Sequence, residues 1–338
     1  MKQPISDSAQ SRLADELGIS RATVSKTIRH CSGVDSQMRL KVLRAARDAD
    51  LLSPQGSCDI YCIIPDTPHF FWGEMRRGIC DAISTLPHPL RIKFNVISSL
   101  HDTEVIEMYL DEAAAMHARV LILAIAATST IRTRLTEFAS RSGTMVLLLS
   151  EYHSIVNSFY IGSDAYHDGS RMAEICAAHF PDHQPAILTV DSNENADART
   201  RGFLDRWDRC TANIIRIPPD YLTDPNLRSS RIARLLTELP ETSSVLYVTF
   251  GIPGLVRAIE KRRTADSPVC LCHDKAPTEC ADFIAAVCIQ DVYGQGRDAI
   301  RAAYQYLTCA QYPIQKRTIL SSTIIDEQIP KEKKGTAI

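Results

Sequence analysis

The chain has 338 residues, of which 45% are hydrophobic and 23% charged, the proportions of a soluble globular protein. This length is too great for one small core and suits a small module joined to two domains of ordinary size. No apolar run reaches the roughly 18–20 residues of a membrane span, and the first ten residues lack the apolar stretch of a signal peptide. We therefore expect a cytoplasmic protein with no membrane segment, whose eleven scattered cysteines are free thiols.

Charge is unevenly divided along the chain. Residues 1–54 hold 9 Lys and Arg against 6 Asp and Glu, whereas the remaining residues hold 29 against 34. A basic head on an acidic body is typical of a protein whose head alone touches a polyanion. The charge pattern therefore excludes a body that binds nucleic acid by its net charge.

The first predicted elements are two short helices within residues 13–29. Apolar residues at helical spacing indicate the first helix: Leu13, Ala14 and Leu17. Gly18 permits the positive φ of a tight turn, and Ser20 is a good N-cap for the second helix. That helix is predicted to bury Val24 and Ile28 and to expose Arg21, Ala22, Ser25, Lys26 and Arg29. The pattern fits a helix-turn-helix or an ordinary helical hairpin.

A third helix is predicted within residues 34–51. Its apolar stripe consists of Met38, Val42, Ala45 and Ala49, widened by Leu43 and Ala46. Asp35 or Ser36 can cap its start, and Pro54 prevents its continuation. We expect this helix to pack over the first two.

From Ile60 onward, short apolar runs alternate with amphipathic stretches. The runs that predict strands are residues 60–64, 92–97, 120–125, 145–149, 159–161, 186–190, 214–217, 245–248, 269–272 and 284–289. Helical spacing occurs at residues 72–86, 103–117, 164–179, 198–208 and 224–239. This alternation predicts parallel sheets with helices on both faces. Ten strands exceed what one such sheet comfortably holds, so two open α/β lobes are expected.

Ligands of open α/β sheets bind at the carboxyl ends of the strands. The loops at those ends contain aromatic rings, a guanidinium, a carboxylate and an amide: Phe70, Phe71, Trp72, Arg199, Asp274 and Gln290. Rings that stack on C–H faces, together with charged planar groups that bind hydroxyls, favour a sugar-like ligand. The sequence contains no P-loop, nucleophile elbow or recognisable catalytic spacing, and we expect neither an enzyme nor a cofactor.

The one Cys/His cluster in the sequence is Cys270-x-Cys272-His273. Structural zinc sites usually combine a C-x₂₋₄-C pair with a second pair of ligands elsewhere. The cluster matches neither requirement, so no metal site is predicted from the sequence.

Residues 19–29 (ISRATVSKTIR) and 34–51 (VDSQMRLKVLRAARDADL) resemble the N-terminal DNA-binding domain of the lactose-repressor (LacI/GalR) family, whose recognition helix has the same Thr-Val-Ser sequence. The resemblance implies that three residues face base edges: Arg21, Ala22 and Lys26. It implies that four others hold phosphates: Ser20, Thr23, Ser25 and Arg29. Typical members have a longer linker that forms a hinge helix with an intercalating Leu. Residues 55–59 are too few and lack Leu, so we expect a short tether without such a helix.

The body resembles the type I periplasmic sugar-binding fold that forms the effector domain of LacI/GalR repressors. The matching stretches are PHFFWGEMRRGI, YIGSDAYHDGSRMAE, RTRGF, CHDKAP and IQDVYGQG. The resemblance implies these ligand-binding residues: His69, Phe71, Trp72, Arg199, Asp274 and Gln290. The chain departs from the family where sugar binders often have Asp-Arg, because it has Ser150-Glu151 there, and we add Glu151 to the candidate ligand residues.

These inferences give a small all-α helix-turn-helix head on an α/β body of two parallel-sheet lobes resembling type I periplasmic binding proteins. The expected division is a head at 1–54, a linker at 55–59, an N-lobe at 60–162 and 292–317, a C-lobe at 163–291 and 318–330, and a tail at 331–338.

The functional hypothesis is a ligand-responsive transcription regulator, most simply a repressor. It would bind double-stranded operator DNA as a homodimer and sense a monosaccharide, polyol or sugar acid, because pairing two half-sites adds their binding energies. The alternative is a cytoplasmic sugar-binding or sugar-processing protein whose helical head mediates protein contacts.

Overall fold

The computed structural model describes residues 7–28, 34–49, 57–66, 69–126, 128–149, 151–207, 212–218, 230–231, 234, 245–250, 269–274 and 284–326. The chain forms two compact units. The first comprises residues 1–162 and 292–318, and the second comprises residues 163–291 and 319–338. No helix among the described residues is both long enough and apolar enough to cross a membrane.

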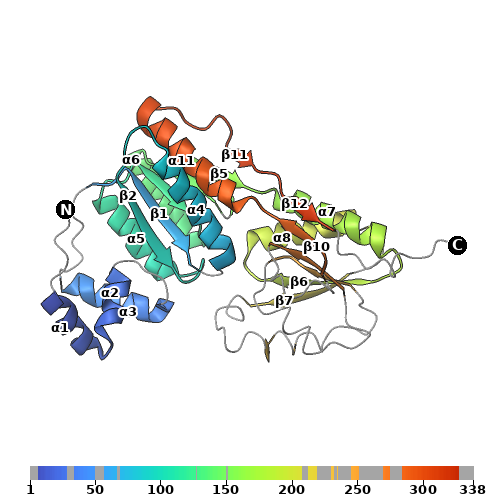
Figure 1. Cartoon of the computed structure of the whole chain (residues 1–338), viewed down its shortest axis with the longest axis horizontal. Coiled ribbons are helices and arrows are strands. Elements are labelled where there is room, and N and C mark those ends of the chain that lie inside the picture. Colours follow the sequence, from blue (N-terminus) through green and yellow to red (C-terminus); the bar gives the residue numbers. More distant parts are fainter. Residues whose placement is uncertain are drawn as a thin grey trace. The chain divides into compact units, whose positions relative to one another are not determined.

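Three short helices form the head of the first unit (Figure 1): α1 (Asp7–Leu17), α2 (Arg21–Ile28) and α3 (Ser36–Asp48). Gly18 has a φ of 66° at the turn between α1 and α2, as the sequence predicts. The Thr23 amide donates to Ser20 Oγ at 3.1 Å, and the Met38 amide donates to Asp35 Oδ1 at 3.0 Å. Both predicted N-caps are therefore confirmed, and Asp35 is the residue that caps α3.

The head core consists of Leu13, Ala14, Val24, Val42 and Ala46, with Ile28, Met38 and Ala45 packed against it. Leu43, which the sequence assigns to this core, packs instead with Leu40 against the body and joins the core of the first sheet. The difference arises because α3 has two apolar faces, and a single stripe read from the sequence merges them.

Further bonds fix α3 and its approach to the first sheet. Ser98 Oγ donates to the Val34 carbonyl oxygen at 3.1 Å, and Arg44 pairs with Glu104 at 3.0 Å. The head therefore rests on the body through α3 rather than hanging from it.

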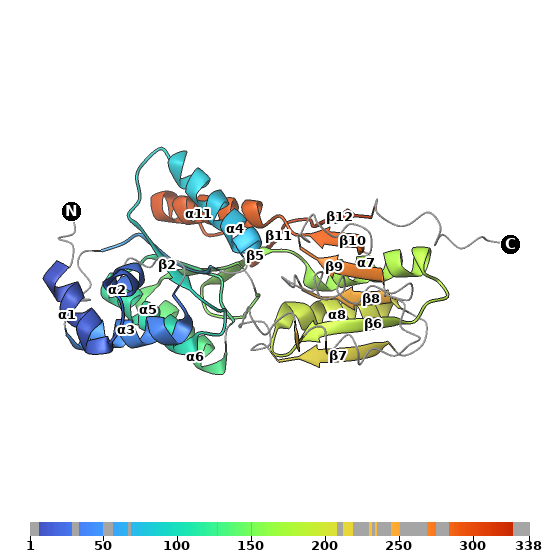
Figure 2. The same ribbon diagram turned by 60° about the horizontal axis from the view of Figure 1, so that its bottom comes forward.

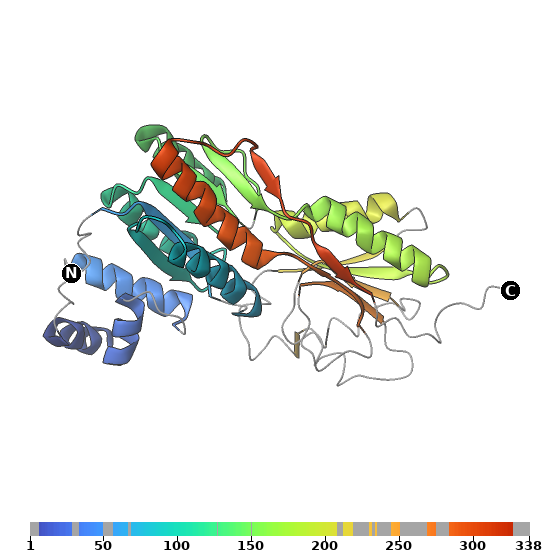
Figure 3. The ribbon, with the colours of Figure 1, turned by 45° about the horizontal axis from the view of Figure 1, so that its top comes forward.

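The first sheet has the strand order β11-β5-β4-β3-β1-β2, and its strands β1 to β5 pair in parallel. The strands are β1 (Ile60–Pro65), β2 (Ile92–Ile97), β3 (Val120–Leu123), β4 (Met145–Leu148), β5 (Ser158–Gly162) and β11 (Arg317–Ile319). Helices α4 (His69–Ser84) and α11 (Val292–Cys309) lie side by side on one face (Figure 3), while α5 (Thr103–Ala115) and α6 (Ser129–Ser142) cover the other (Figure 2). Apolar residues of β1, β3 and β4 pack with α5 and α6 in one core, and the helices on both faces give the unit three layers.

The second sheet has the order β12-β10-β9-β8-β6-β7 and is parallel except for β12, which runs antiparallel to β10. Its strands are β6 (Pro185–Val190), β7 (Asn213–Ile217), β8 (Val245–Val248), β9 (Val269–His273), β10 (Ile284–Ile289) and β12 (Thr323–Ile325). Helices α7 (Ala165–His179) and α8 (Glu194–Arg206) pack on one face over Ile187, Tyr247 and Leu271.

All ten predicted strands are present, with ends that shift by one or two residues. The three-residue strands β11 and β12 are not predicted, because their apolar residues are too few to form a run. The helix predicted at 224–239 falls almost wholly outside the described residues, as does the tail at 331–338.

The expected tether at 55–59 needs a correction. Arg91 holds Asp59 through two nitrogens at 2.9 and 3.1 Å and also donates to Ser57, while the Cys58 amide donates to the Met116 carbonyl oxygen at 3.0 Å. Residues 57–59 are thus bound to the first sheet, because a carboxylate and two backbone groups find partners there. Residues 55 and 56 lie outside the described residues.

Candidate functional site

Arg199 is the most distinctive polar residue of the second unit. It lies on α8, which follows β6 and is capped at its N-terminus by Asn193, whose side chain accepts from the Ala196 amide at 2.8 Å. Its side chain is only 3% exposed, and Nη1 donates to the Thr249 carbonyl oxygen at 2.7 Å. Nε and Nη2 have no partner among the described residues. A buried guanidinium with two unpartnered nitrogens lowers the stability of the fold unless another molecule accepts hydrogen bonds from them.

Close helix packing fixes the position of this arginine. Gly169 on α7 lies directly against the backbone of Arg199, and Gly202 on α8 lies directly against the backbone of Tyr166. Neither position has room for a Cβ. The crossing of α7 and α8 therefore holds the backbone of Arg199 in place over the end of the sheet.

Asp274 follows β9 and has a left-handed backbone with a φ of 62°. Its amide donates to the Cys288 carbonyl oxygen at 2.7 Å, and its Oδ1 accepts from Gln290 Nε2 at 3.1 Å. Gln290 Oε1 in turn accepts from Ser163 Oγ at 3.0 Å. Burial raises the pKa of Asp274, and the nearby Arg199 charge acts in the opposite direction. Gln290 thus uses both ends of its amide to orient Asp274.

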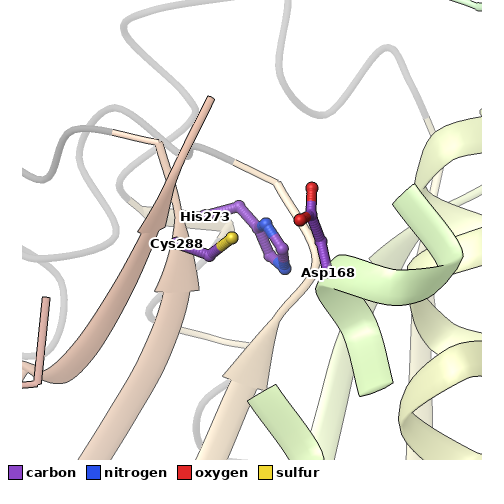
Figure 4. Close-up of side chains that lie close together, drawn as sticks. All are labelled: Asp168, His273 and Cys288. Atoms are coloured by element: carbon purple, nitrogen blue, oxygen red, sulfur yellow. The ribbon is translucent and has the colours of Figure 1, made fainter. Parts of the chain in front are cut away.

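A second cluster of side chains lies beside Arg199 and Asp274, and its three members come from three different elements (Figure 4). Asp168 is in the first turn of α7, His273 ends β9, and Cys288 is on β10; all three are buried. His273 Nε2 lies 2.8 Å from the Tyr247 hydroxyl, whereas Nδ1 has no partner among the described residues. Burial and the Arg199 charge hold the pKa of His273 well below its ordinary value, which favours the neutral imidazole.

The aromatic candidates of the first unit lie in the opening turn of α4. The rings of Phe71 and Trp72 meet edge to face with centroids 4.7 Å apart, and Trp72 is buried while Phe71 is partly buried. His69 is exposed and lies over Gly73, where a Cβ would be 2.9 Å from its ring. The helix begins at His69, three residues earlier than the apolar spacing predicts. Contact of these three side chains with a ligand stays a prediction.

Glu151 forms a buried pair just after β4. Its Oε2 lies 3.3 Å from His153 Nε2, and both side chains are almost completely buried. Nearby at the end of β1, Asp66 pairs with Arg76 at 2.9 Å. Sequence reasoning selects Glu151 but misses His153, because the spacing of two residues in a loop does not predict which side chains meet.

The predicted DNA-contacting residues are distributed over α2 and its N-cap. Ser20, Arg21, Ala22 and Lys26 are exposed, whereas Thr23 and Ser25 are partly exposed. Ser20 Oγ also lies 2.9 Å from Thr23 Oγ1, so both hydroxyls take part in the cap. Arg29 lies outside the described residues.

One cavity of about 600 Å³ opens in the first unit near Ala118 and Gly143, at the amino ends of β3 and β4. Of its charged lining residues, Arg134 pairs with Asp111 and lies 4.0 Å from Glu137, and Arg119 is exposed. None of the charged residues that line this cavity is buried as Arg199 is, so the cavity is the weaker candidate.

No model of a known protein family matches the sequence, and no curated protein does. Solved structures match the fold. The glucose-galactose binding protein GanP from Geobacillus stearothermophilus is 15% identical, with a TM-score of 0.69 over 84% of this chain and 100% of its own. A carbohydrate transporter solute binding protein from Agrobacterium radiobacter, in complex with D-arabinose, is also 15% identical, with a TM-score of 0.68 over 81% of this chain and 95% of its own.

A sugar transporter from Clostridium phytofermentans is 16% identical, with a TM-score of 0.67 over 80% of this chain and 100% of its own. At these identities the likeness establishes architecture alone. The expectation of two α/β lobes is thereby confirmed: the body of this chain has the fold of type I periplasmic sugar-binding proteins.

Proposed function

We propose that the α/β body binds a small sugar-like molecule, namely a monosaccharide, a polyol or a sugar acid. The observation that supports this most is Arg199, a buried cation in the second unit with two nitrogens that have no hydrogen-bond partner among the described residues. Asp274 lies close enough to Arg199 for their charges to interact, and its carboxylate can accept hydrogen bonds from hydroxyls. A guanidinium and a carboxylate together suit adjacent sugar hydroxyls, which both accept and donate.

The solved structures support the same ligand class. GanP is described as a glucose-galactose binding protein, and the Agrobacterium radiobacter protein was solved with D-arabinose. Their shared fold makes a sugar the first class of molecule to test.

Titration calorimetry tests this proposal with D-glucose, D-galactose, D-arabinose, D-sorbitol and D-gluconate as probes. Arg199→Ala should weaken the binding of whichever probe binds by about a hundredfold, because charged hydrogen bonds contribute about 1.5–3 kcal/mol each. Arg201→Ala is the matched control, since Arg201 lies on the same helix and is exposed. Equal affinity of the Arg199 and Arg201 variants, or no heat from any probe with the unaltered protein, would contradict the proposal.

We further propose that the head binds double-stranded DNA, so that the protein is a cytoplasmic, ligand-responsive regulator acting as a homodimer and most simply as a repressor. The exposed side of α2, with Arg21, Ala22 and Lys26, supports this second function. A short capped helix with exposed cations fits the major groove, where Arg and Lys favour guanine O6 and N7.

A gel shift on the DNA upstream of its own gene tests the head. Arg21→Ala should cost about 1–3 kcal/mol on the specific site and much less on random DNA. Arg12→Ala, on the exposed side of α1, is the matched control. An equal loss on both DNAs would make Arg21 a phosphate contact. Full sugar binding without any DNA shift would instead favour a sugar-binding or sugar-processing protein whose head contacts another protein.

The contact between α3 and the body supports a route between the two proposed activities. Leu40 and Leu43 share a core with α5, and Arg39 is completely buried beside Tyr109. A head joined to the body in this way changes orientation when the body moves, without folding or melting of a hinge helix.

A further inference from the structure

The buried cluster of Asp168, His273 and Cys288 combines side chains that sugar binding does not need. One donor atom from each residue lies within 4.8 Å of the other two, and all three side chains are buried. In Figure 4 the Cys288 sulfur and the Asp168 carboxylate lie on either side of the His273 ring. Carboxylate, imidazole and thiol are the three side-chain types that bind Zn²⁺ in proteins.

The hydrogen bonds of His273 leave one nitrogen available. Nε2 is held by the Tyr247 hydroxyl at 2.8 Å, while no described residue partners Nδ1, although His273 is only 1% exposed. When Nε2 carries the proton and donates to Tyr247, Nδ1 presents a lone pair. Metal-binding histidines usually show this arrangement, with the second ring nitrogen fixed by a hydrogen bond.

We propose that Asp168, His273 Nδ1 and Cys288 Sγ bind a divalent transition-metal ion of the Zn²⁺ or Co²⁺ class. Three protein ligands leave the fourth tetrahedral position for a water or for an oxygen of a bound molecule. Bonds of 2.0–2.3 Å place tetrahedral ligand atoms about 3.3–3.8 Å apart, so donors that lie within 4.8 Å of one another need to approach by about 1–1.5 Å at most. The ion would tie the start of α7 to β9 and β10.

Charge balance permits an ion here despite the nearby Arg199. A divalent ion with the Asp168 carboxylate and a Cys288 thiolate is neutral overall, and binding displaces the thiol proton to solvent. The Asp274 carboxylate remains to offset the guanidinium. Asp168 also accepts from Ser322 Oγ at 2.9 Å, a bond that fixes one carboxylate oxygen and leaves the other to coordinate.

Cobalt titration of the full-length, reduced and metal-free protein tests the proposal without reference to sugar or DNA binding. One equivalent of Co²⁺ should give tetrahedral d–d bands together with a thiolate-to-cobalt charge-transfer band in the near ultraviolet. Zn²⁺ should displace the Co²⁺ and abolish both features.

Cys288→Ser should remove the charge-transfer band and weaken Co²⁺ binding at least tenfold. The matched control is Cys272→Ser, a buried cysteine on β9 outside the group, which should behave as the unaltered protein. Tyr247→Phe, a positioning variant, should weaken binding about tenfold while keeping the thiolate band. Circular dichroism establishes that each variant is folded.

Two results would overturn the proposal. One is a Co²⁺ spectrum of the unaltered protein without a thiolate band, which needs no variant to fold. The other is a Cys288→Ser protein that binds Co²⁺ with the affinity and spectrum of the Cys272→Ser control, which would show that the remaining thiols bind the ion.

Discussion

The two units have similar architectures, but the polar side chains at the ends of their strands differ in how they are partnered. At the strand ends of the first unit Asp66 pairs with Arg76 and Glu151 Oε2 lies 3.3 Å from His153 Nε2, although Glu151 Oε1 has no hydrogen-bond partner among the described residues. In the second unit the buried Arg199 has two nitrogens, and His273 has one, without a hydrogen-bond partner in the part of the chain that the structure describes. Paired groups maintain structure, whereas buried unpaired groups indicate where another molecule is expected. The second unit is therefore the one we expect to recognise the polar atoms of a ligand.

The largest expected loss of stability comes from breaking a buried pair of side chains. His153→Ala leaves the buried Glu151 carboxylate without its partner and should lower the free energy of unfolding by about 3–5 kcal/mol. Arg199→Met should cost far less in the sugar-free protein, because it removes a cation that makes a single hydrogen bond to the described residues. Urea denaturation followed by circular dichroism measures both. A larger loss for Arg199→Met than for His153→Ala would reverse the comparison.

Sequence reasoning finds what local chemistry decides. The apolar runs predict all ten strands of the parallel sheets, and the cap residues Ser20 and Asp35 follow from their own neighbourhoods. Arg199 and Asp274 are found from their places after predicted strands and again through the resemblance to sugar-binding proteins. The sequence cannot show that Arg199 lacks partners, because its neighbours Thr249 and Gly169 come from distant parts of the chain.

The residues that sequence reasoning misses meet only through the tertiary fold. Asp168, His273 and Cys288 span 120 positions and belong to three elements, so no spacing links them. Leu43 is assigned to the wrong core because a helical stripe shows which residues are apolar but not which of two neighbours covers them.

A moderate effect is expected at the two helix crossings, which are built in the same way. Gly78 lies against the Tyr293 backbone between α4 and α11, as Gly169 lies against Arg199 between α7 and α8. Gly78→Ala and Gly169→Ala should each lower the free energy of unfolding by about 1–3 kcal/mol, because the helices must separate. Only Gly169→Ala should also weaken sugar binding, since it displaces Arg199.

Denaturation and calorimetry on the same two proteins separate these effects. His167→Ala, at an exposed position on α7, is the control and should change neither quantity. Equal losses of sugar affinity in the Gly78 and Gly169 variants would show that the second unit has no special part in recognition.

The smallest expected effects are two pH dependences of opposite sign. Arg91 lowers the pKa of Asp59 in the first unit, so this carboxylate stabilises the fold above its unfolded pKa of about 3.9, and the contribution is lost as the pH falls through the folded pKa. Burial raises the pKa of Asp274 in the second unit, so its favourable contribution exists at low pH and is lost as the pH rises through that raised pKa.

Unfolding measured from pH 3 to pH 7 in the presence of a chelator checks both signs. At pH 7 Asp59→Asn should be less stable than the unaltered protein and Asp274→Asn more stable, and both differences should shrink toward pH 3. Two differences of the same sign at pH 7 would contradict the assignment of an arginine-paired carboxylate to one unit and of a carboxylate destabilised by burial to the other.

The Nε–H group of Arg199 can be observed directly by ¹⁵N–¹H correlation of arginine side chains. Its signal is identified by its loss in Arg199→Lys. When the sugar that binds in calorimetry is added to saturation, the Arg199 signal should shift and its exchange with water should slow, while the Arg201 signal stays in place. Saturation of the protein with that sugar and no change at the Arg199 signal would contradict the claim that this residue awaits the ligand.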